Sequence, residues 1–179
     1  MVRSIPGPRT WVAAEFVDNV ELNTEIRDAL NYLLDPPRAE LRQTVTQNLT
    51  TATWTDITYT TEDYDQTNDP GHDTVTNTAR YTAPVTAWYE ISGCVATATM
   101  ASSTLFVRAA VNGSAVAASR AATPFVSGAA TGVALPRFGV FLTAGDYVTM
   151  QGRQDTGGTV ATVVAAEAAC RFSVRLIGK

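Results

Sequence analysis

The chain has 179 residues, a net charge of −4 and only 17% charged residues, which fits one medium domain and excludes a disordered polyelectrolyte. Its isoelectric point near 4.9 argues against general nucleic-acid binding, and no apolar run approaches the roughly 20 residues that span a bilayer. Threonine and alanine are abundant, with 27 residues each, and Lys179 is the only lysine. The threonine excess indicates β-structure, whereas the arginine bias reflects a GC-rich genome.

The N-terminal stretch predicts an extended arm followed by a helix. The first ten residues contain two prolines and no apolar segment, so we expect no secretory signal peptide. A helix is predicted over residues 18–35, because Asp18 and Glu21 form a capping-box-like start and Asp35-Pro36-Pro37 an abrupt stop. At heptad spacings it carries an apolar seam of Leu22, Ile26, Ala29 and Leu33. Two heptads are too short to be stable alone, so the seam needs a partner, either the body of the same chain or identical helices of other copies.

After Pro37 the helical period disappears, and short strands alternate with turns rich in glycine, proline, asparagine and aspartate. Strands are expected over residues 41–48, 53–60, 74–82, 86–99, 104–111, 133–142, 146–153, 159–164 and 168–177. This pattern predicts an all-β antiparallel sandwich or jelly roll over residues 40–179, preceded by an arm and anchoring helix over residues 1–39.

Charge is distributed unevenly along the chain. Residues 44–78 carry six acidic residues and no basic one, whereas residues 79–179 carry a net charge of +4. An acidic and a basic segment could pair between copies of the chain, or they could be ordinary solvated loops.

The sequence offers few residues for catalysis or metal binding. His72 is the only histidine and lies in a Pro-Gly-His-Asp turn, so no catalytic triad and no enzyme are predicted. The acidic stretch 62–73 is either a solvated loop or a calcium site, for which the candidate ligands are Asp63, Asp65 and Asp69. No other cofactor is expected.

The tryptophans and cysteines favour structural roles. Sugar binding by Trp11, Trp54 or Trp88 is a lesser alternative to burial in a core or an interface. Cys94 and Cys170 fall on opposite faces of their strands by parity, which predicts inert buried thiols rather than a disulfide or redox pair.

One segment carries a family resemblance. Residues Arg80–Gly93 (RYTAPVTAWYEISG) resemble the F-T-A-P-x-x-G-x-Y-x-F signature of C1q/TNF-like jelly rolls, with Ala87 where that family usually has glycine. Later segments are similar to that family as well: Val111–Gly113, Leu142–Val148 and Phe172–Ile177. The resemblance covers Glu40–Gly178. It implies a C1q/TNF-like jelly roll that forms a homotrimer through one sheet of each sandwich, with the last strand beside the signature strand.

Strand parity assigns the faces of these two strands. On the signature strand, Tyr89, Ile91 and Val95 point into the core, whereas Trp88, Glu90, Ser92 and Cys94 point outward. On the last strand the core residues are Cys170, Phe172, Val174 and Leu176, and the outward residues are Arg171, Ser173 and Arg175. Together with the implied trimer, this gives the hypothesis that Trp88 anchors the subunit interface. Glu90 is expected to meet Arg171 or Arg175.

A second resemblance concerns the leader. Residues 10–37 are similar to the T-W…L-N-x-x-I-R-D-N-L-N-x-L leader of virion proteins from tailed bacteriophages that infect GC-rich bacteria. This implies a non-enzymatic virion protein: a trimeric head that residues 1–39 attach to other virion proteins at a tail tip, baseplate or fibre base. Its loops would be available to a host-surface glycan or protein. The alternatives are a capsid decoration or head-fibre protein, a stand-alone glycan-binding module and, last, a depolymerase.

Overall fold

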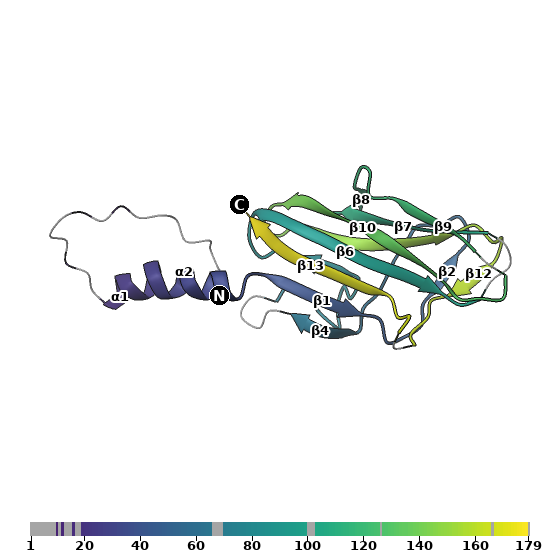
Figure 1. Ribbon diagram of the computed structural model, residues 1–179, viewed down its shortest axis with the longest axis horizontal. Helices are drawn as coiled ribbons and strands as arrows, with labels where there is room; N and C mark the ends of the chain where they lie inside the picture. Colours follow the sequence, from purple (N-terminus) through teal and green to yellow (C-terminus); the bar gives the residue numbers. More distant parts are fainter. Residues whose placement is uncertain are drawn as a thin grey trace.

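The computed structural model describes residues 10, 12, 16, 19–65, 70–99, 103–125, 127–165 and 167–178, with only the backbone at residues 21, 22, 24, 25, 28, 29 and 31. Most of the described chain forms a β-sandwich, and a helical segment extends from one end of it (Figure 1).

The helical segment runs from Asn19 to Leu34. It consists of α1 (Asn19–Leu22), a π-helical turn, η1 (Asn23–Arg27), and α2 (Asp28–Leu34). It ends one residue before the Asp35-Pro36-Pro37 stop, because proline lacks the N–H that would continue the helical ladder. Among the described residues no helix is long and apolar enough to cross a membrane.

Burial of one side chain and two hydrogen bonds mark the base of the helix, where it meets the sandwich. Tyr32 is buried, the hydroxyl of Tyr64 donates a hydrogen bond to the Asp35 carboxylate, and the Pro37 carbonyl accepts a 2.8 Å hydrogen bond from the Leu176 amide. The chain then enters the first strand at Arg38. The helix is therefore tied to the sandwich at its C-terminal end.

Two antiparallel sheets form the sandwich. The first, called here the β6 sheet, has the strand order β10-β6-β13-β1-β4. Its strands are β10 (Thr131–Leu142), β6 (Ala87–Thr97), β13 (Arg171–Gly178), β1 (Arg38–Arg42) and β4 (Thr61–Asp65). The last strand thus pairs with the signature strand β6, as the family resemblance implied.

The second sheet, called here the β11 sheet, has the order β3-β11-β7-β8, with β5 paired to β11 and β9 paired to β7. Its strands are β3 (Thr55–Asp56), β11 (Tyr147–Gln154), β7 (Thr104–Val111), β8 (Ser114–Ala115), β5 (Arg80–Thr82) and β9 (Ala121–Pro124). A small third sheet at one end joins β2 (Asn48–Thr50) to β12 (Thr159–Ala161).

The long strands lie close to their predicted ranges, and β7 coincides with the predicted 104–111. Several short segments differ. The predicted strand 41–48 is divided between β1 and β2, which belong to different sheets, and only the last three residues of 74–82 are in a ladder. Strands β4, β8 and β9 were not predicted, because their pairing depends on partners distant in sequence rather than on local alternation.

Aromatic rings from several strands fill the core between the sheets. Tyr59 stacks on Phe172 with ring centroids 5.9 Å apart, and Tyr81 meets Tyr89 edge to face at 6.1 Å. The buried Tyr89 hydroxyl donates a 2.9 Å hydrogen bond to the Val85 carbonyl. The tyrosine of the signature therefore fills the core and fixes the turn that leads into β6.

Candidate functional site

The outer face of the β6 sheet holds the predicted interface residues. Tyr89 and Ile91 are fully buried, as parity predicted, whereas Trp88 on the same strand is exposed. On β13, Phe172 and Val174 are buried and Arg171 and Arg175 are exposed. The predicted faces of both strands are therefore confirmed.

Three apolar side chains form an exposed patch at the end of this face near the helix. Trp88 and Phe141 are cross-strand partners with ring centroids 5.6 Å apart, and Ile177 lies where the β13 register shifts. Each is between 45% and 50% exposed. A Cβ built on Gly139 would lie 3.7 Å from the Trp88 ring and 3.6 Å from the Ile177 side chain, so these two side chains lie beside Gly139. We call Trp88, Phe141 and Ile177 the Trp88 patch.

Sequence analysis found Trp88 but missed Phe141 and Ile177. The register of β10 against β6 shifts between Leu135 and Phe138. That irregularity breaks the alternation that would have assigned Phe141 to the outer face.

Glu90 forms ion pairs with two arginines beside the patch. Its carboxylate oxygens lie 2.6 Å from Arg137 Nε and 2.9 Å from Arg175 Nε. The hydrogen bond and charge of Arg137, helped by Arg175, lower the pKa of Glu90. Of the two predicted partners of Glu90, Arg175 is the one that it meets within the chain. Arg171 instead pairs with Asp63.

The calcium candidates make contacts within the chain. Asp63 pairs with both Arg42 and Arg171, and these arginines lower its pKa. Asp65 accepts hydrogen bonds from the backbone amides of Gly71 and His72 at 3.3 and 3.0 Å, and Asp69 lies outside the described residues. In the part of the chain that the structure describes, no three His, Cys, Asp or Glu side chains gather as metal ligands. Calcium binding by this loop stays a prediction.

His72 is buried and joins β4 to the turn that precedes β5. Its Nδ1 lies 2.8 Å from Glu62 Oε1 on β4, and its Nε2 lies 3.0 Å from the Thr78 carbonyl oxygen. The ring also meets Tyr59 edge to face. These contacts give His72 a role in fixing the loop against the core.

The predicted helix seam is exposed where it is described. Ile26 and Leu33 are 47% and 75% exposed, and the unpredicted Leu30 and Leu34 are 52% and 80% exposed. The side chains of Leu22 and Ala29 lie outside the described residues. The sandwich of the same chain therefore leaves the described seam residues open to water.

Trp54 is the one predicted sugar-binding candidate that lies on the outer face of the β11 sheet. It is half-buried, with the guanidinium of Arg108 4.1 Å from its ring centroid. Trp88 belongs to the patch described above, and Trp11 lies outside the described residues.

The two cysteines are free thiols. Cys170 is fully buried beside the backbone of Ala96, and burial raises its pKa to about 11. Cys94 is half-buried, with its Sγ 3.7 Å from the Ala169 carbonyl oxygen. The predicted placement on opposite faces fits these surroundings.

Cys170 is therefore expected to resist alkylation in the folded protein. At pH 8 its thiolate is scarce and its sulfur inaccessible, so iodoacetamide should modify Cys170 only after denaturation. Peptide mass spectrometry of native and denatured samples measures this, and Cys94→Ser isolates the signal. Labelling of Cys170 at the same rate in both samples would contradict the buried, inert thiol.

Comparison with known proteins bears on the fold. No protein-family model matches the chain, and no curated protein matches its sequence. Eiger TNF from S. frugiperda superposes with a TM-score of 0.53 and 14% sequence identity, over 80% of this chain and 95% of that one. Murine APRIL superposes with a TM-score of 0.53 and 11% identity, over 78% of this chain and 99% of that one. The sandwich is therefore a TNF-like jelly roll, the fold that the Arg80–Gly93 resemblance implied.

Proposed function

We propose that this protein is a non-enzymatic structural subunit that acts as a homotrimer, with the Trp88 patch in the subunit interface. The observation that carries the proposal is the exposure of Trp88, Phe141 and Ile177 together on one sheet face. Large apolar side chains that are contiguous and exposed mark interaction surfaces, and aromatic residues are enriched where binding energy is concentrated. The sequence resemblance to C1q/TNF-like proteins, which implies assembly through one sheet, supports the choice of a second copy as partner.

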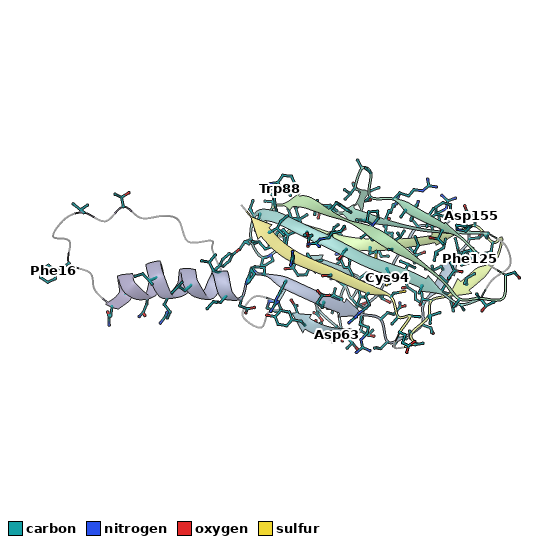
Figure 2. The ribbon with its side chains drawn as sticks, in the orientation of Figure 1. Phe16, Asp63, Trp88, Cys94, Phe125 and Asp155 are labelled. Atoms are coloured by element: carbon teal, nitrogen blue, oxygen red, sulfur yellow. The ribbon has the colours of Figure 1, made fainter. Side chains whose placement is uncertain are left out.

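The helical segment supports the same assembly. The exposed apolar residues of α2 lie at the end of the sandwich that also presents the Trp88 patch (Figures 1 and 2). Because a helix of this length is marginal alone in water, the exposed face needs a cover. Two covers fit: the same helix of the neighbouring subunits, or a surface of a larger particle on which each copy docks.

The proposed location is a tailed-phage virion, with the helical leader as anchor at a tail tip, baseplate or fibre base. The likeness of residues 10–37 to phage virion leaders supports this, as does the arginine bias. In this assignment the end of the sandwich far from the helix is free to contact the host surface. A capsid decoration or head-fibre protein of the same architecture is the second candidate.

Native mass spectrometry of the full chain tests the assembly. We expect three times the mass of one chain at micromolar concentration, because a three-fold assembly of identical subunits is closed. A monomer mass throughout the accessible concentration range would overturn the trimer. Cryo-microscopy of intact particles tests the location, since density for this protein on the capsid rather than the tail selects the second candidate.

A further inference from the structure

An arginine-rich cluster lies on the outer face of the β11 sheet, remote from the Trp88 patch. The guanidinium of Arg108 lies 4.1 Å from the Trp54 ring centroid, and that of Arg120 lies 4.5 Å from the Phe106 centroid. Arg153 lies 6.0 Å from the first ring and 5.6 Å from the second. The rings themselves meet edge to face at 6.4 Å. We call Trp54, Phe106, Arg108, Arg120 and Arg153 the arginine cluster.

Register explains how distant segments form this cluster. Phe106 on β7 is the cross-strand partner of Arg153 on β11, and Arg108 is the partner of Gln151. Arg120 directly precedes β9, which pairs with β7 on its other side. Two of the guanidiniums therefore come from neighbouring strands and the third from the residue just before the next strand, and three strands span about 10 Å at the usual strand spacing. Such a row suits a polymer with repeated charges better than a single small anion.

Most arginines of the β6 sheet pair with carboxylates of the same chain, whereas most of those in the arginine cluster do not. On the β6 sheet, Arg42, Arg137, Arg171 and Arg175 each pair with a carboxylate of the same chain, and Arg38 stacks on the Tyr64 ring. Among the residues that the structure describes, Arg153 is the one member of the arginine cluster that pairs with a carboxylate, that of Asp155, at 3.0 Å. Among the described contacts Arg108 donates a 2.7 Å hydrogen bond to the neutral Gln151, and Arg120 contacts only an aromatic ring.

One further carboxylate, that of Asp56, lies near the cluster and already accepts hydrogen bonds from two neutral side chains. Asp56 accepts hydrogen bonds from Thr149 and from Gln151 at 2.8 and 2.9 Å. Burial lowers the pKa of Arg108, with a further lowering by the charge of Arg153, and the charge of Asp56 offsets this only in part. Arg108 and Arg120 are thus held in place by aromatic rings, with N–H groups available to an external anion.

The form of the cluster favours a carboxylated ligand. A planar guanidinium presents paired N–H groups that match a carboxylate, and an arginine already fixed on a ring loses less conformational entropy on binding. Single-stranded nucleic acid, by contrast, needs free aromatic faces for base stacking. Here each ring already has a guanidinium against it, and the whole chain carries a charge of −4.

We propose that the arginine cluster binds a carboxylated polysaccharide, with Arg108 and Arg120 as its principal ligands. The position of the arginine cluster in the fold fits a contact with a surface outside the proposed assembly. Asp155, which marks the Arg153 side of the cluster, lies at the end of the sandwich opposite Trp88 and the helix (Figure 2). The proposal goes beyond the structural role and does not depend on trimer formation, although a trimer would present three such faces and bind a polymer with higher avidity.

The test measures binding of the full chain to immobilised polygalacturonate at low ionic strength, with neutral dextran as the uncharged surface. We expect saturable binding to polygalacturonate that weakens with added salt, and no binding to dextran. The double variant Arg108→Gln/Arg120→Gln should weaken binding about tenfold or more, since two charge-assisted contacts are removed.

The matched control is Arg38→Gln on the β6 sheet. Arg38 also stacks on an aromatic ring, 4.2 Å from the Tyr64 centroid, so this variant removes one guanidinium and the same kind of contact elsewhere, and its match is the single variant Arg120→Gln. Arg38→Gln should bind like the unmodified protein. If the double variant fails to fold, Arg120→Glu tests the same point, because Arg120 is exposed and contacts only Phe106 among the described residues.

Three results would overturn the proposal. The first is the absence of saturable binding to polygalacturonate at low ionic strength. The second is an equal loss of binding in Arg38→Gln, which would indicate a general charge effect. The third is tighter binding to an oligothymidylate than to polygalacturonate, which would assign the surface to nucleic acid instead.

Discussion

Replacing Trp88 with arginine is expected to convert the proposed trimer to monomers. The Trp88 ring is half-exposed in the single chain and contacts Phe141 at the centre of the exposed apolar patch. In an interface such a side chain would contribute about 2 kcal/mol or more per subunit, and an arginine there would bury an unpaired charge beside Arg175 and Arg137. Native mass spectrometry should show the mass of one chain where the unmodified protein shows three.

A matched control and a second variant make this prediction decisive. Val75 is 83% exposed in the 74–79 turn, which leads into β5 of the other sheet, so Val75→Arg adds the same charge outside the proposed interface and should remain trimeric. Ile177→Arg changes the edge of the patch without removing the Trp88 ring. If Trp88→Arg and Ile177→Arg both retain the trimer mass and a native circular dichroism spectrum, the patch is not the interface.

Gly93→Ala is expected to be the most destabilising single-methyl substitution in the β6 sheet. A Cβ at this position would lie 2.5 Å from the backbone oxygen of Arg171, 2.8 Å from Met150 Sδ and 3.3 Å from the Phe172 Cα. The sulfur can move, but the oxygen and the Cα belong to the strand that pairs with β6. Relief therefore requires the β6–β13 ladder to open locally, at a cost of about 3 kcal/mol.

Gly132→Ala provides the comparison within the same sheet. Its Cβ would lie 3.8 Å from the nearest atom, the Val95 carbonyl oxygen, so it should change stability by less than about 0.5 kcal/mol. Thermal unfolding followed by circular dichroism should show Gly93→Ala melting roughly 10 °C lower than the parent. Equal melting temperatures for the two variants would contradict the close approach of β13 to Gly93.

Local sequence patterns were sufficient to predict which side chains of β6 and β13 face the core and which face outward. Side chains of a strand alternate with a period of two, so the burial of Tyr89 and the exposure of Trp88 follow from the residues of one strand alone. The end of the helical segment follows in the same way, because Pro36 and Pro37 act on the backbone next to them. The jelly-roll fold could also be predicted from the sequence, because the Arg80–Gly93 segment resembles the family signature.

Contacts between distant segments could not be predicted from local sequence patterns. The register shift in β10 placed Phe141 beside Trp88, and the pairing of Arg171 with Asp63 joins residues 108 positions apart. Parity predicted correctly that Arg171 points outward, but the choice between Glu90 and Asp63 as its partner depends on the position of β4. Nothing in the local sequence of β4 indicates that position.

The sequence by itself determined which side chains point inward and outward on β6 and β13, where the helix ends, and the absence of an established catalytic motif. These properties depend on neighbouring residues and on strand and helix periodicity. Only the tertiary structure decided the composition of the Trp88 patch and of the arginine cluster. Both are assembled across strands by register, and register is set by the packing of the whole sandwich rather than by any one segment.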